Sequence, residues 1–150
     1  MCSSDLTALV ETTMKLYPEV LGYRIRMGEC LLRSGQLKLA SGDIPGSAAD
    51  WRRGVSFYER LSIRVGELAM FEAGCHALLS SVAGLPGSGV PPADRSAEME
   101  KAMFILRPLV AAGYHAPELR IESSLDPLRS LPQFVRLMED AAFPIEPFAH

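Results

Sequence analysis

Apolar residues recur at three- and four-residue intervals along almost the whole chain of 150 residues. This spacing constrains the fold more than any other feature, because it places apolar side chains on one face of an α-helix. A half-buried strand would need strict alternation over four to eight residues, and such alternation is hard to find here. The sequence therefore predicts an all-α protein.

Glycine and proline divide this pattern into segments. A first helix is predicted from Asp5, a good N-terminal cap, to the residue before Pro18. A second helix follows over 19–41, with Gly42 as its C-terminal breaker. After a short turn, a third helix over 47–61 carries one apolar stripe, formed by Trp51, Val55, Tyr58 and Leu61.

The second half of the chain continues in the same way. A fourth helix over 65–83 is rich in glycine and alanine, which predicts close approach of a neighbouring helix. Residues 84–93 read GLPGSGVPPA and predict a flexible loop. A fifth helix starts at 94 or 96, contains Pro108 and runs to Ala112, with Gly113 as its stop.

The C-terminal part is punctuated by prolines. Asp126-Pro127 predicts a helix start, and Ser130 with Gln133 predicts a capping box before a last helix over 131–142. The chain thus divides into a half-repeat (5–18), a helix pair (19–61), a second pair (64–114, with the loop 84–93 inserted) and a C-terminal cap (115–150). Together they form one domain.

The first helix pair carries a recognisable order of small and large residues. Gly35, Gly42, Ser47, Trp51 and Gly54 follow one another at the spacing of a tetratricopeptide repeat. Ser34 and Lys38 depart from that pattern, since leucine and tyrosine are usual there. The second pair fits with an insertion, through Ala73, Gly74, Ala77, Ala102, Leu106 and Leu109.

A longer stretch, over about 40–148, resembles the C-terminal repeat region of large bacterial serine/threonine protein kinases. Its most specific pieces are AAGY, LDPLRS-P-F and FP-EPF. The resemblance implies a tetratricopeptide-like right-handed superhelix beside a kinase domain. The chain itself has no G-x-G-x-x-G loop, H-R-D or D-F-G motif, so it is not expected to transfer phosphate. Because the pattern starts in mid-repeat, we expect a gene fragment or a shortened relative.

Charge and cysteine content narrow the class of protein further. The net charge is −3, and neither half of the chain is basic, which argues against a nucleic-acid partner. Three cysteines without C-x-x-C spacing favour reduced thiols in the cytoplasm. The N-terminus does not resemble a signal peptide, and no apolar stretch is long enough to predict a membrane span.

Candidate catalytic groups are few. Cys75 and His76 are adjacent, but neighbours on a helix point about 100° apart and do not form a dyad. His76, His115 and His150 lack the spacing of metal ligands. We therefore predict no catalytic, cofactor-binding or metal-binding residue. Arg52, Arg53 and Arg60 are a secondary candidate for contact with an acidic peptide.

The predicted function is binding of a protein or an amphipathic peptide. In repeat arrays the first helix of each pair lines a concave groove, and helical spacing assigns to it Glu29, Leu32, Gln36, Leu39, Leu68, Phe71, Cys75 and Leu78. Alternatively, the apolar tail residues Phe143, Ile145 and Phe148 fill this wall. A further alternative is homodimerisation through the uncovered half-repeat, by Leu6, Leu9, Val10 and Met14.

Overall fold

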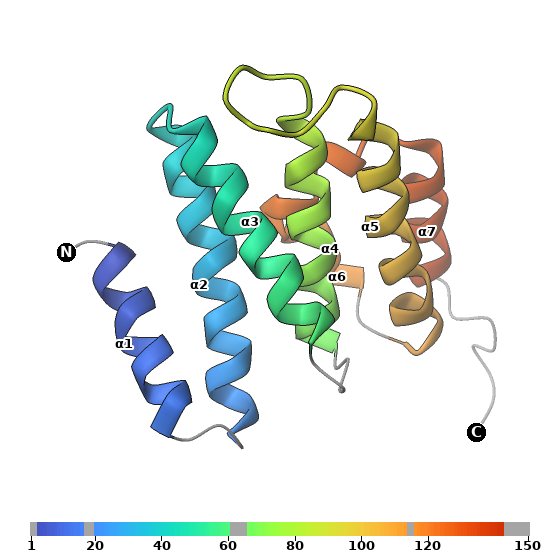
Figure 1. The fold of residues 1–150 in the computed structure, drawn as a ribbon. Helices are drawn as coiled ribbons and strands as arrows, with labels where there is room; N and C mark the ends of the chain where they lie inside the picture. The colour runs from blue at the N-terminus through green and yellow to red at the C-terminus, as the bar shows by residue number, and fades with distance from the viewer. Residues whose placement is uncertain (1–2, 17–19, 61–65, 114–115, 143–150) are drawn as a thin grey trace.

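The computed structural model describes residues 3–16, 20–60, 66–113 and 116–142, and these contain helices and no strand (Figure 1). This confirms the all-α prediction. Successive long helices run antiparallel and pack side by side. Their bounds are α1 Ser3–Leu16, α2 Leu21–Ala40, α3 Ile44–Glu59, α4 Gly66–Ser81, α5 Asp94–Ala111, α6 Ala116–Ile121, the 3-10 helix η1 Ser123–Leu128 and α7 Pro132–Ala142.

The turn between α2 and α3 follows directly from its residues. Gly42 has a φ of 84°, a left-handed conformation that glycine adopts without steric cost. The carboxylate of Asp43 then accepts a hydrogen bond from the backbone N–H of Gly46 at 2.9 Å, and Pro45 lies in the first turn. This cap starts α3 at Ile44, three residues before the predicted start at 47.

Aromatic rings on α3 pack onto glycines of α2. A side chain at Gly35 would collide with the indole of Trp51, and one at Gly28 would collide with the ring of Tyr58. Both rings are almost completely buried. The indole Nε1–H of Trp51 also donates to the carbonyl oxygen of Leu32 at 3.2 Å. The two helices therefore fit closely because small residues on α2 face large ones on α3.

Helix α4 lies at the centre of the fold and packs against α2, α3, α5 and η1 (Figure 1). Its residues 68–80 are all buried, which explains why apolar side chains occur around its whole circumference. The predicted close approach occurs at Gly74, where an added side chain would collide with Ser124. Across the neighbouring interface, Ala102 and Leu106 of α5 are fully buried.

The loop between α4 and α5 is more structured than the sequence predicts. The N–H of Gly84 donates to the carbonyl of Val90 at 2.9 Å, and Arg95 donates to the carbonyl of Ala83 at 2.7 Å. Ser88 and Val90 are buried. Left-handed glycines let the chain reverse within this short segment, at Gly84, Gly87 and Gly89.

Two predicted caps in the C-terminal part are wrong. Asp126-Pro127 does not start a helix but lies inside η1, whose N-terminal cap is Glu122. Gln133 accepts a hydrogen bond from Arg107 at 3.1 Å, so its side chain is turned toward α5. The partner of Gln133 is 26 positions away, so the local capping pattern did not reveal it, whereas the cap at Glu122 is local and was overlooked. The tail 143–150 lies outside the described residues.

Candidate binding cleft

Most of the apolar side chains assigned to a concave groove are buried. Leu32 and Cys75 are completely inaccessible, and Leu39 is partly buried. Leu68, Phe71 and Leu78 are also buried. At these positions the structure therefore shows buried side chains and no open apolar wall. Their role in binding a partner stays a prediction, and it would require this core to open.

Part of the cover over this face is the segment formed by Glu122 and η1. Arg33 on α2 donates two hydrogen bonds to the Glu122 carboxylate, at 2.9 and 2.8 Å. Next to it, Gln36 donates to the hydroxyl of Ser123 at 3.2 Å. Glu29 is instead paired with Arg26 of its own helix at 2.7 Å. The polar members of the predicted groove therefore lie at its edge, where Gln36 contacts the covering segment.

Below this polar edge, η1 packs into the core. Ser124 lies against Gly74, and Leu125 and Leu128 are completely buried. The predicted self-capping residues Phe143, Ile145 and Phe148 lie outside the described part of the chain. Among the described residues, the segment 122–128 lies on this face.

Burial alone would raise the pKa of the Glu122 carboxyl. The hydrogen bonds from Arg33 and Ser124, together with the Arg33 charge, outweigh burial and lower it. Glu122 is therefore ionised at neutral pH and forms a charge-assisted, two-point contact with α2.

All four residues of the predicted oligomer face belong to α1, and the structure describes the side chain of one of them, Leu9. Leu9 on α1 is 63 % exposed. The side chains of Leu6, Val10 and Met14 lie outside the described set. Leu16, seven residues after Leu9, is also strongly exposed, and α1 itself packs against α2. The described part of α1 thus presents apolar side chains to solvent.

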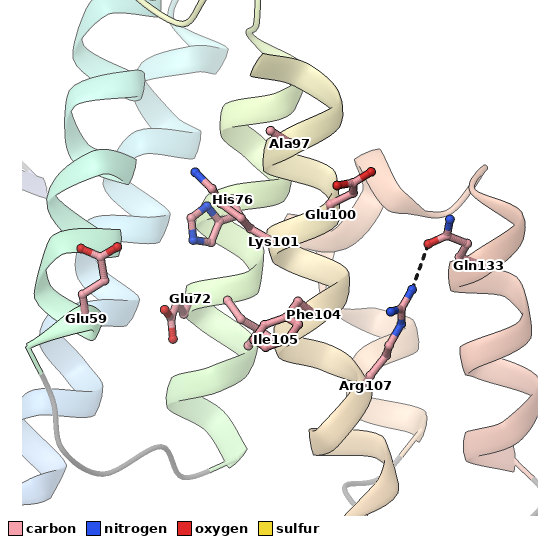
Figure 2. A pocket seen from close by; sticks show the side chains of 10 residues that line it. All are labelled: Glu59, Glu72, His76, Ala97, Glu100, Lys101, Phe104, Ile105, Arg107 and Gln133. Atoms are coloured by element: carbon pink, nitrogen blue, oxygen red, sulfur yellow. Dashed lines mark hydrogen bonds between the residues drawn. The ribbon is translucent and has the colours of Figure 1, made fainter. Parts of the chain in front are cut away.

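A cleft of about 660 Å³ lies on the other face of the array, between α3, α4 and α5 (Figure 2). His76 of α4 borders it, two residues after Gly74, and these positions are roughly 200° apart around a helix. The cleft is therefore opposite to η1. Its lining residues are Glu59, Glu72, His76, Ala97, Glu100, Lys101, Phe104, Ile105, Arg107 and Gln133.

His76 and Lys101 of the cleft belong to a charged network with Glu98, which lines an adjoining hollow. Nδ1 of His76 and Oε2 of Glu98 are 2.6 Å apart, and the same carboxylate binds Lys101 at 2.7 Å. Burial raises the pKa of Glu98, but the hydrogen bonds and charges of Lys101 and His76 outweigh it and lower that pKa. This arrangement fixes the orientation of the imidazole, which Figure 2 shows between α3 and α5.

The mouth of the cleft combines an aromatic ring with carboxylates. Phe104 of α5 is 72 % exposed, although a side chain of this size is usually buried. Glu59 comes from the end of α3 and Glu100 from α5. Arg107 extends toward α7, where it is hydrogen-bonded to Gln133 (Figure 2).

The arginines singled out in the sequence lie together in a second hollow. Arg52, Arg53 and Arg60 line about 420 Å³ between α2 and α3, with Met27 and Phe57 among their apolar neighbours. Helix α3 therefore contributes residues both to this basic hollow and, through Glu59, to the cleft. The sequence placed these arginines near one another but did not indicate the apolar side chains beside them.

Cys75 is fully buried beside Gly54 of α3. Burial, assisted by the charge of Glu72, raises the pKa of its thiol well above the ordinary value. The thiol therefore stays protonated. Among the described residues, no group of three His, Cys, Asp or Glu side chains is arranged to hold a metal ion.

The fold and its sites define an all-helical protein of antiparallel pairs, with one face covered by the chain and a cleft on the other. None of the described helices is long and apolar enough to cross a membrane. Comparison of the chain with protein-family models, curated proteins and solved structures finds no match.

Proposed function

We propose that the chain is a non-enzymatic protein-binding module with a tetratricopeptide-like superhelical arrangement. Within this proposal it acts in the cytoplasm, as part of a repeat array that belongs to a serine/threonine kinase. The kinase association rests on the sequence resemblance over about 40–148 alone.

The observation that carries the repeat interpretation is the α2–α3 pair. Trp51 and Tyr58 occupy the space that side chains at Gly35 and Gly28 would need. The sequence pattern predicts this order of small and large residues for a tetratricopeptide pair. Stacked helix pairs of this kind give extended surfaces suited to protein partners, and the cleft between α3 and α5 is one such surface.

The kinase association is tested by the DNA sequence in frame with the codon for Met1. A kinase domain encoded in that frame would support the proposal. A stop codon directly upstream would contradict a role in the same polypeptide. If such a stop codon is present, the chain could still bind a kinase that another gene encodes. Co-purification of the tagged chain with that kinase would then test the association. If neither the coding sequence nor co-purification reveals a kinase, the proposed kinase association is wrong.

A homodimer is the second candidate, favoured by the exposure of Leu9 and Leu16 on one helix. Two-fold contact between copies of α1 would bury both side chains. Light scattering on the full chain at high concentration should then give the mass of a dimer, and Leu9→Glu should return it to a monomer. A strictly monomeric wild-type chain rules this candidate out.

A further inference from the structure

We propose that the cleft between α3, α4 and α5 docks an arginine-containing segment of a partner protein. This inference rests on the proposed function, because it names the partner chemistry of one surface of the same module. It concerns the face opposite to η1, which is not the face that the sequence assigned to a partner.

The charge balance of the cleft favours a cationic partner. The cleft adjoins a hollow of about 410 Å³ that shares Glu59, His76 and Lys101 with it. The residues that line the cleft and this hollow include five carboxylates and three lysine or arginine side chains. The carboxylates are Glu59, Glu72, Asp94, Glu98 and Glu100, and the basic side chains are Arg52, Lys101 and Arg107.

Two of the carboxylates that line the cleft itself, Glu59 and Glu100, remain for a ligand. Lys101 is already bound to Glu98 at 2.7 Å. Glu59 and Glu100 have no ion-pair partner within the described part of the chain. Glu59 is also the last residue of α3, where the partial negative charge of the helix C-terminus adds to its own.

The exposed ring of Phe104 selects arginine among cations. A guanidinium group stacks on an aromatic face and at the same time donates hydrogen bonds to carboxylates. Phe104 supplies the face, and Ile105 beside it belongs to the core beneath. Docking would bury the exposed ring of Phe104. Aromatic side chains are enriched at the buried centres of protein interfaces.

The test uses the full chain and a fluorescein-labelled peptide of twelve residues, in which arginine alternates with alanine and leucine. Fluorescence anisotropy should show binding that weakens as salt rises. A peptide with glutamate in place of arginine should not bind. The double variant Glu59→Gln with Glu100→Gln should weaken binding about 10-fold, and Phe104→Ala about 5- to 30-fold.

Matched variants outside the cleft serve as controls. Glu118→Gln with Glu139→Gln removes the same charge from exposed positions on α6 and α7, and Ile121→Ala removes an exposed apolar side chain. Both should bind the peptide as the wild type does. The inference is overturned if the arginine peptide does not bind, or if cleft and control variants weaken it equally. Either result leaves the kinase association intact, since that is judged by coding sequence and co-purification.

Discussion

Gly35 has no side chain, and the indole of Trp51 uses the space that one would fill. A methyl group at this position must push the indole away or force α2 and α3 apart. Overfilling of a well-packed core usually costs about 1–3 kcal/mol. The glycine is therefore a steric requirement of the α2–α3 interface.

We expect Gly35→Ala to lower the free energy of unfolding by about 1–3 kcal/mol. Gly22→Ala, on the same helix with nothing within 4 Å of the added carbon, should leave it unchanged or raise it by up to ~1 kcal/mol. Urea unfolding of both variants measures the difference. Equal effects would mean that the ring does not pack tightly on Gly35.

The contact between Arg33 and Glu122 gives stability a specific pH dependence. Because the folded pKa of Glu122 is lowered, its contribution is complete above the unfolded pKa of ~4.3 and is lost as the pH falls through the folded value. Glu122→Gln should therefore cost about 1–3 kcal/mol at pH 7 and much less at pH 3. Urea unfolding at both pH values checks this.

Glu139→Gln is the matched control, since this glutamate is exposed on α7. It should change stability by less than ~0.5 kcal/mol at either pH. A cost of Glu122→Gln that does not shrink in acid would show that the charge of Glu122 is not what holds the segment.

At the scale of elements, η1 is short but contributes a large part of the packing on α4. Leu125 is completely buried, whereas Ile121 only a few residues earlier is 82 % exposed. We expect Leu125→Ala to cost about 2–5 kcal/mol, and Ile121→Ala less than ~0.5 kcal/mol, in chemical denaturation. Similar costs would contradict the placement of η1 as a core element.

Helices were the predictable part of this fold, because their signals are local. Periodicity and the glycine and proline breakers placed a helix over 19–41 and another from 94 or 96 to 112, close to α2 at Leu21–Ala40 and α5 at Asp94–Ala111. The cover over α2 and α4 was not predictable in this way. Arg33 and Glu122 are 89 positions apart, and nothing local pairs them.

The sequence contains a weak signal for the cleft. Glu72 and His76 are polar residues one turn apart in the segment 68–79 of α4, which is otherwise apolar, and buried polar groups need partners. The partner of His76 is Glu98, which lies beyond the loop and is 22 positions away. The pattern indicates that a polar site exists, but not which side chains complete it.

At the scale of the molecule, the segment 122–128 connects elements that are distant in sequence. Glu122 and Ser123 bind α2, while Ser124 lies against α4. A stack of helix pairs can lose one pair at a time, but a segment in contact with both pairs couples them. We therefore expect one cooperative unfolding transition for the whole chain.

Trp51 makes this expectation directly measurable. It is the only tryptophan of the chain, and its indole is completely buried between α2 and α3. Its emission should be blue-shifted in the native protein and should report the state of that pair alone. Circular dichroism reports every helix together. If the two signals change at the same urea concentration, the pairs unfold as a unit; if the emission shifts first, the α2–α3 pair separates early.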